Sequence, residues 1–228
     1  MAKENTTAKA DALDNVNETL TGIEQKVQNN QKVIMWVIIA AAALVCIVLG
    51  YYYGIRRPGI EAANNAIGQA DITLAMGNDS LALKQYQQVA DEYGYDAGNR
   101  ARLNAAILLY QQGKYQEALD YVKGYSGSDD IIAAGAKSLE GDCLVNLKKY
   151  DEAIGCFREA AKISDGNPYY TPVFMMKEAT VQRELKNYKA EAELYRAIDR
   201  EYPEYAASQQ IDFEKYITRA EAQAGEQK

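Results

Sequence analysis

The longest apolar stretch of the chain runs from Val33 to Gly50 and contains no charged residue. Three tyrosines extend it to 21 residues, and a helix of that length is about 32 Å long, enough to cross a bilayer. Trp36 lies near the other end, and such aromatic side chains are typical of the headgroup layer. The pattern predicts a transmembrane helix over residues 33–53 and a linker over 54–62.

A buried core helix, a cleaved signal peptide and a lipoprotein signal all fit this stretch less well. A buried core helix usually keeps a polar stripe, whereas this stretch is apolar on every face. A cleaved signal peptide has a short basic leader, but a long polar segment precedes this stretch and no small-residue cleavage site follows Gly50. A lipoprotein signal would place Cys46 at the end of the apolar run and after a small residue, yet Val45 precedes it. We therefore expect a permanent anchor, with Cys46 as a packed or lipid-facing thiol.

Charges on either side of the span bear on its orientation. Lysines at positions 3, 9, 26 and 32 precede it, and Arg56 and Arg57 follow it closely. The excess of positive charge before the span favours a cytoplasmic N-terminus. Most of the 25 basic residues follow the span, but long domains are translocated largely regardless of their charge, so these residues do not oppose this orientation. The opposite orientation stays open as an alternative.

Residues 1–32 form a polar leader in which apolar residues recur every three or four positions, the a/d rhythm of a coiled coil. Gly22 costs about 1 kcal/mol of helix propensity, so a frayed amphipathic helix remains an alternative. Binding to a membrane surface is disfavoured, because the acidic residues of the segment would be repelled by anionic headgroups. The sharper hypothesis is self-association into a homo-oligomer, or docking to a partner helix, through Leu13, Val16, Leu20, Ile23 and Val27.

A similar ten-residue segment occurs four times after the span. The copies begin at positions 77, 113, 148 and 186 and read GNDSLALKQY, GKYQEALDYV, KKYDEAIGCF and KNYKAEAELY. Spacings of 36, 35 and 38 residues separate their reference positions, which are Asp79, Tyr115, Tyr150 and Tyr188. Repeats of about 34 residues are typical of stacked helix-turn-helix units. The pattern predicts an array over 63–204, made of hairpins at 63–96, 99–130, 134–168 and 172–204.

The last three copies resemble the tetratricopeptide repeat, in which a polar turn leads to a tyrosine, with a small residue three positions later and a large one seven positions later. In the second copy these are Tyr115, Ala118 and Val122. Small residues also recur on the preceding helices, at Ala70, Ala106, Gly141 and Ala179. The resemblance implies an all-α fold: a right-handed α-solenoid of about four helical hairpins behind a single transmembrane helix.

Two copies depart from the repeat pattern. Asp79 replaces the tyrosine in the first copy, and Glu191 stands where the fourth should have a small residue. We expect the terminal copies to pack less well for this reason. After Pro203, apolar residues between positions 205 and 224 predict one further amphipathic helix that caps the array, so 205–228 is interpreted as a capping helix and tail.

Composition excludes most catalytic chemistry. The 228 residues include no histidine, so a Ser-His-Asp triad, a Cys-His pair and an imidazole metal site are impossible. A formal net charge of −7 does not suit nucleic acid. The sequence also lacks a glycine-rich phosphate loop and a CxxC motif. We therefore expect no enzyme activity, no metal and no cofactor.

Two cysteines fall in one predicted hairpin. Cys143 and Cys156 lie on opposite helices, and export from the cytoplasm would make a disulfide conceivable. Buried reduced thiols are favoured, because two facing helices seldom bring Cα atoms within the roughly 4.4–6.8 Å that a bridge requires.

The resemblance also implies a concave surface, lined by the first helix of each hairpin, that binds protein or peptide ligands. A polar and aromatic trough of this kind suits an extended peptide or a partner helix. A clamp for chaperone carboxyl termini is disfavoured, because Leu139 and Asp142 stand where cations or amides would be needed. For each single residue an ordinary solvated helix surface remains the alternative. The candidates are Arg100, Leu103, Ile107, Tyr110, Gln111, Ser138, Asp142, Asn146, Val173, Met176, Thr180 and Arg183.

The layout as a whole is a short polar leader, one span, a basic pair and an acidic repeat array. It resembles the bacterial ancillary subunit of the Sec translocon. That resemblance implies an inner-membrane protein with a cytoplasmic N-terminus and a periplasmic array, which lies beside the translocation channel and passes secreted chains to periplasmic chaperones. Two alternatives stay open: an envelope assembly factor that coordinates cell-wall or division machinery, and a scaffold that faces the cytoplasm.

Overall fold

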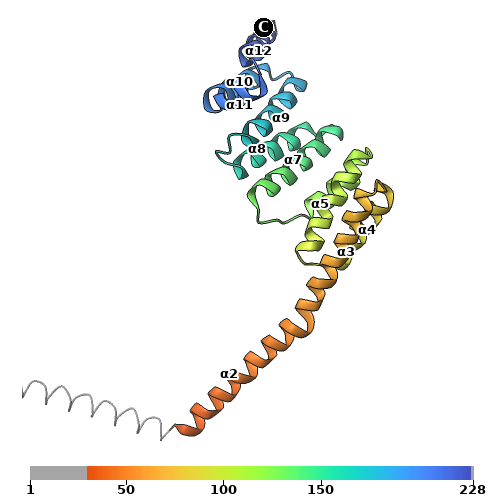
Figure 1. Ribbon diagram of the computed structural model, residues 1–228. Helices are drawn as coiled ribbons and strands as arrows, with labels where there is room; N and C mark the ends of the chain where they lie inside the picture. The colour runs from red at the N-terminus through yellow and green to blue at the C-terminus, as the bar shows by residue number, and fades with distance from the viewer. Residues whose placement is uncertain (1–29, 227–228) are drawn as a thin grey trace, which may run out of the picture. The chain divides into compact units, whose positions relative to one another are not determined.

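The computed structural model describes residues 30–226, which are helical apart from short turns (Figure 1). No β-strand occurs in that range, in agreement with the predicted all-α class. The chain divides into two compact units between Pro58 and Gly59. The predicted self-association residues fall outside the described range, so pairing of the leader stays a prediction; they are Leu13, Val16, Leu20, Ile23 and Val27.

The first unit contains the apolar segment as helix α2 (Gln31–Tyr51), followed by the π-helical turn η1 (Tyr52–Arg56). No residue of α2 is buried. Length and composition make this helix a candidate membrane span. In η1 the rings of Tyr52 and Tyr53 pack edge to face with centroids 5.2 Å apart. The guanidinium of Arg56 lies 5.9 Å from the centroid of the Tyr52 ring.

Residues 54–62, which the sequence predicts only as a linker, are helical and belong to η1 and α3 (Arg57–Ala75). Pro58 explains why a π turn comes directly before it. Proline has no N–H to donate, and in a regular α-helix its ring collides with the carbonyl four residues earlier. A π turn widens the helix locally and relieves that collision.

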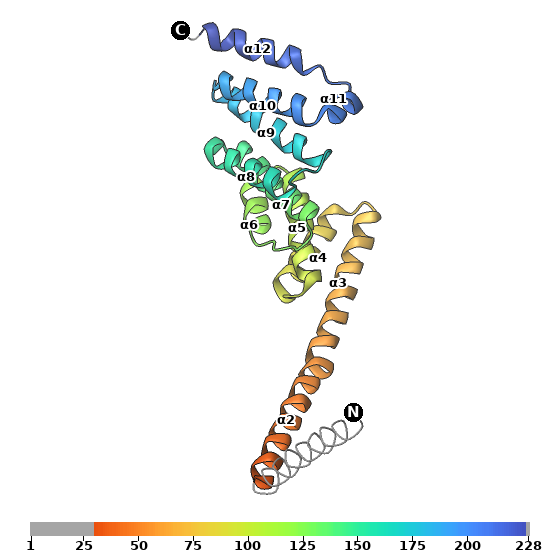
Figure 2. The ribbon, with the colours of Figure 1, turned by 90° about the vertical axis from the view of Figure 1, so that its left-hand side faces the viewer.

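The second unit contains four helical hairpins, each with a first and a second helix. The first hairpin is α3 with α4 (Asp79–Glu92), and the second is α5 (Asp96–Gln111) with α6 (Tyr115–Lys123). The third is α7 (Asp130–Asn146) with α8 (Tyr150–Ile163), and the fourth is α9 (Tyr170–Glu184) with α10 (Tyr188–Glu201). From α4 to α10 each helix packs against the next one along the chain, so the hairpins form a stack (Figure 2).

The four hairpin turns share one left-handed residue, two positions before the second helix begins. Gly77 and Gly113 have φ angles of 79° and 74°, and Lys148 and Lys186 have 61° and 59°. Glycine adopts this conformation readily, whereas another L-residue costs roughly 1–2 kcal/mol. The turns therefore lie in the same register as the four repeated sequence segments, although the last two place lysine where the first two place glycine.

The small residues of the repeat lie where the helices approach most closely. Ala70, Ala106, Gly141 and Ala179 are all buried. On the second helices Ala82, Ala118 and Ala153 are also completely buried. Large side chains fill the space around them, among them Tyr86 and Phe157, each 1% exposed. This packing joins the first three hairpins and Val181 of the fourth in one core cluster, whereas Ala179 belongs to a second cluster with the C-terminal helices.

The C-terminal end differs from the sequence-based prediction. The sequence predicts one capping helix from Tyr205, but the structure has two, α11 (Pro203–Gln209) and α12 (Phe213–Glu226). The prediction of a single helix is wrong because Gln210 takes the left-handed conformation, with φ 55°, and ends α11. Of these two C-terminal helices, only α12 packs extensively against α10.

Candidate peptide-binding face

Polar contacts connect the first helices of successive hairpins. Arg100 on α5 pairs with Asp71 on α3, with 2.6 Å between Nη2 and Oδ2. Asn146 on α7 donates from Nδ2 to the hydroxyl of Tyr110 on α5 over 3.3 Å. Lys177 on α9 reaches Asp142 on α7, with 2.5 Å between Nζ and Oδ2. We call the surface formed by α3, α5, α7 and α9 the first-helix face.

The predicted groove residues divide by exposure. Those exposed on the first helices are Arg100, Ile107, Gln111, Asn146 and Thr180. Those partly buried are Leu103, Tyr110, Asp142, Val173, Met176 and Arg183. Ser138 is buried, and its hydroxyl accepts a hydrogen bond from Lys177 Nζ over 2.9 Å. The first-helix face therefore offers a mixture of exposed and tethered side chains.

The structure does not bring all twelve predicted residues to one site. Val173 and Met176 pack against the C-terminal core cluster formed with Tyr195, Phe213 and Ile217. The sulfur of Met176 also accepts a hydrogen bond from the hydroxyl of Tyr205 on α11 over 3.5 Å. These side chains contribute to the joint between the fourth hairpin and the C-terminal helices.

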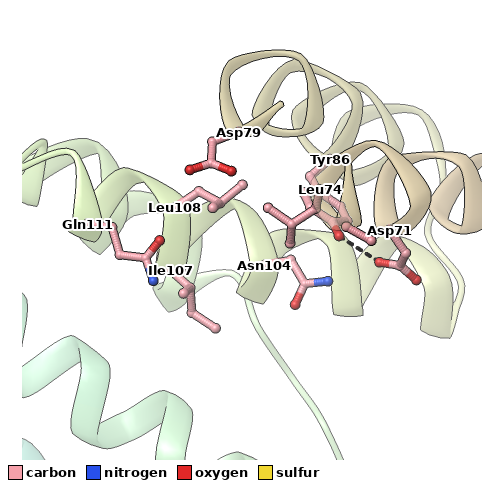
Figure 3. A pocket seen from close by; sticks show the side chains of 9 residues that line it. Asp71, Leu74, Asp79, Tyr86, Asn104, Ile107, Leu108 and Gln111 are labelled. Carbon is pink, nitrogen blue, oxygen red and sulfur yellow. Dashed lines mark hydrogen bonds between the residues drawn. The ribbon is translucent and has the colours of Figure 1, made fainter. Parts of the chain in front are cut away.

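A pocket opens on the first-helix face between the first two hairpins (Figure 3). Its volume is about 450 Å³. Ile107 and Gln111 line it, as members of the predicted set. The sequence reasoning missed the other lining residues, which are Asp71, Leu74, Ala75, Asp79, Tyr86, Asn104 and Leu108. One signal could have pointed here: the replacement of the repeat tyrosine by Asp79.

One residue that lines this pocket is a buried phenol. Tyr86 is 1% exposed, and its hydroxyl donates to Asp71 Oδ1 over 2.6 Å, as the dashed line in Figure 3 shows. Burial and the neighbouring Asp71 carboxylate both raise the pKa of Tyr86. The phenol therefore stays protonated and holds Asp71 in place, while Arg100 holds the other carboxylate oxygen.

The third hairpin carries the two cysteines. Cys143 on α7 and Cys156 on α8 are both buried free thiols. Burial raises the pKa of each thiol to about 12, with a further contribution from Glu140. Neutral buried thiols of this kind behave as small apolar side chains. Within residues 30–226, no group of three or more His, Cys, Asp or Glu side chains is placed to hold a metal ion.

The fourth hairpin buries a carboxylate where the other hairpins have alanine. Glu191 is 0% exposed, and its Oε1 lies 2.7 Å from Nη2 of Arg219 on α12. The guanidinium of Arg219 also lies 5.2 Å from the centroid of the Tyr216 ring. The departure from the repeat pattern at Glu191 therefore provides a charged contact with the C-terminal helix.

Comparison with known proteins agrees with this architecture. The family described as "Tetratricopeptide repeat" matches residues 67–130, which span the first two hairpins. The crystal structure of MamA superposes with a TM-score of 0.54 at 15% identity, covering 72% of this chain and 92% of MamA. PilF of Pseudomonas aeruginosa gives a TM-score of 0.51 at 16% identity, covering 81% of this chain and 90% of PilF. No curated protein matches the chain by sequence.

The fold is that of a tetratricopeptide-repeat solenoid. Solenoids of this type use extended surfaces to bind other proteins and are generally not enzymes. The fold thus suggests a protein-interaction scaffold, and nothing in residues 30–226 points to catalysis. At this level of identity the likeness concerns the fold alone and identifies no partner.

Proposed function

We propose that this chain is a membrane-anchored scaffold that binds protein partners through its first-helix face. The observation that carries the proposal is the ladder of contacts that ties α3, α5, α7 and α9 together: Asp71–Arg100, Tyr110–Asn146 and Asp142–Lys177. These contacts fix the face before a partner arrives, and a preformed surface loses little conformational entropy on binding. Exposed side chains such as Ile107 and Gln111 stand beside the ladder and remain available to a partner.

Crosslinking from defined positions tests the face. A photoreactive phenylalanine analogue placed at Gln111 or Thr180, which are exposed and take no part in these contacts, should form adducts with other proteins in living cells. The matched control is Glu117, an exposed residue on the second helix α6. Equal adduct yields from Glu117 and Gln111 would show that the first-helix face is not the binding surface.

Anchoring is proposed from helix α2. Its 21 residues, none of them buried, expose apolar side chains all round, an arrangement that water disfavours and lipid accommodates. A basic pair follows it at Arg56 and Arg57. Membrane fractions washed with alkaline carbonate should retain the chain, and release into the wash would refute the anchor.

Location at the bacterial envelope is the finer part of the proposal. The charge difference across the span supports a cytoplasmic N-terminus and a periplasmic array. A reporter that is active only in the periplasm, fused after Lys228, should be active; a reporter active only in the cytoplasm should be silent there. The reverse result would make this chain a scaffold that faces the cytoplasm.

The proposed partners are components of the Sec translocon, emerging secreted polypeptides and periplasmic chaperones. The support for this choice is the arrangement of leader, span, basic pair and acidic array. Identification of the proteins crosslinked from Gln111 and Thr180 tests it. Translocon subunits or nascent secretory chains are expected, whereas enzymes of cell-wall synthesis or division would favour the envelope assembly function.

A further inference from the structure

The first hairpin lacks the aromatic side chain that the other hairpins place at the start of the second helix. In the second hairpin, Tyr115 is partly buried, and its ring packs against Tyr110 with centroids 5.4 Å apart. The corresponding residue of the first hairpin is Asp79, the first residue of α4, and it is exposed. A large ring is thus replaced by a short carboxylate at the edge of the first-helix face.

The replacement coincides with the pocket of about 450 Å³ between α3, α4 and α5. In Figure 3 Asp79 stands at one side of this pocket, above Leu108 and across from Asn104. Leu74, Ile107 and Leu108 give the pocket apolar walls, while Asn104 and Gln111 contribute amide groups. An apolar pocket with a few fixed polar groups is the usual form of a binding site.

The two carboxylates of the pocket differ in their surroundings. Asp71 is already neutralised, because Tyr86 donates to one of its oxygens and Arg100 binds the other. Asp79 forms no ion pair with any of residues 30–226. A partner that filled the pocket with an apolar side chain would remove water from Asp79 and leave only the N-terminus of α4 to compensate its charge, which is unfavourable. A cationic head group would compensate for that loss.

We propose that this pocket binds a lysine or arginine side chain of an extended segment of a partner protein, in the space that tyrosine occupies in the other hairpins. The aliphatic stem lies along Leu74 and Ile107, and the cationic head pairs with Asp79. Such side chains bury their methylene groups while keeping the charge on a polar partner. This inference rests on the proposed function, because it specifies the chemistry that one part of the first-helix face recognises.

Binding of matched peptides to the full chain tests the inference. The protein is held in nanodiscs of phosphatidylcholine, a neutral lipid, and empty nanodiscs give the baseline. The probe is a fluorescein-labelled nonapeptide with the central sequence Leu-Arg-Leu in a Gly-Ser frame. A second probe has citrulline in place of arginine, which keeps the shape and removes the charge. Fluorescence anisotropy should show about fivefold tighter binding of the arginine probe, the size of one partly exposed ion pair, and less difference at high salt.

Three variants assign the effect to the pocket. Asp79→Asn should abolish the preference for the arginine probe. Asp151→Asn makes the same change of charge on an exposed residue of α8 and should preserve the preference. Asp79→Tyr restores the side chain of the other hairpins and should block both probes while unfolding at the same temperature or higher. Helical circular dichroism shows that each variant is folded.

Equal affinity for the arginine and citrulline probes overturns the inference, and so does an unchanged preference in Asp79→Asn. Either result leaves the scaffold proposal standing if crosslinks from Gln111 to cellular proteins persist. Conversely, if Gln111 forms no crosslinks to cellular proteins but the purified chain still prefers the arginine probe, the scaffold proposal fails and the inference about the pocket stands. The two failures are therefore distinguishable.

Discussion

Gly141 on α7 lies directly against the ring of Phe157 on α8. A Cβ built on Gly141 would sit 2.6 Å from Cε1 of Phe157 and 2.9 Å from its Cζ. Phe157 is 1% exposed and packed on all sides, so the ring has no room to retreat. The absence of a side chain at Gly141 is what allows these two helices to approach.

We expect Gly141→Ala to lower the free energy of unfolding by about 1–2 kcal/mol. Overpacking a core costs roughly 1–3 kcal/mol, and the better helix propensity of alanine returns up to about 1 kcal/mol. Denaturant unfolding of the full chain in detergent, followed at 222 nm, measures the change. Gly135→Ala is the matched control on the same helix, because nothing lies within 4 Å of its added Cβ. That control should be neutral or stabilising, and an equal effect of the two substitutions would contradict the packing argument.

The repeat architecture could be predicted because its signal is local and periodic. The second helices of three hairpins begin at Tyr115, Tyr150 and Tyr188. Small residues such as Ala106 are buried on the first helices. Residue type and spacing alone carry that information, since each hairpin repeats the same packing. The apolar span is equally local, and it coincides with α2.

Contacts between distant residues could not be predicted in this way. Asp71 and Arg100 are 29 residues apart, and Glu191 and Arg219 are 28 apart. Neither pair follows from the periodicity of its own helix, because the partner is chosen by the stacking of hairpins. The break at Gln210 is also beyond sequence reasoning, since glutamine gives no turn signal of its own. Glu191 is recognisable as unusual from the repeat pattern, but only the structure supplies its partner.

The buried pair Glu191–Arg219 should control docking of α12. Arg219→Ala leaves a carboxylate in a fully buried position and is expected to cost about 3 kcal/mol of unfolding free energy. Restoring the alanine of the other hairpins as well, in Glu191→Ala with Arg219→Ala, should recover most of this loss. Thermal unfolding of the single and double variants measures both effects.

A second ion pair in the same helix interface serves as the control. Arg196 on α10 pairs with Glu221 on α12, and both side chains are 49% exposed. Arg196→Ala should therefore cost less than about 1 kcal/mol. A loss equal to that of Arg219→Ala would mean that burial of Glu191 does not determine the cost.

The thiols of the third hairpin should resist alkylation while the protein is folded. A pKa of about 12 for Cys143 and Cys156, against an ordinary value of 9.0, leaves about a thousandfold less thiolate at pH 8, and thiolate is the reactive form. In a Cys46→Ser background, iodoacetamide should modify both residues within minutes in urea and far more slowly in buffer. Mass spectrometry follows the reaction. Rapid labelling of the folded chain would show that α7 and α8 separate readily.

Tyr86 should make the stability of the first hairpin sensitive to alkaline pH. Its pKa is raised in the folded state, so the folded chain keeps the phenolic proton at pH values where the unfolded chain loses it. The stability linked to this proton comes first from burial of the phenol and then from Asp71. It is complete below about pH 10 and is lost as the pH rises toward the folded pKa, at up to about 1.4 kcal/mol per pH unit. The pKa values of other tyrosines are also raised by burial, among them Tyr110 and Tyr195. The comparison that isolates Tyr86 is thus with Tyr86→Phe, which cannot titrate. Denaturant unfolding between pH 9 and pH 11.5 should show a shallower decline for this variant, and parallel curves would mean that the phenol does not hold its proton against Asp71.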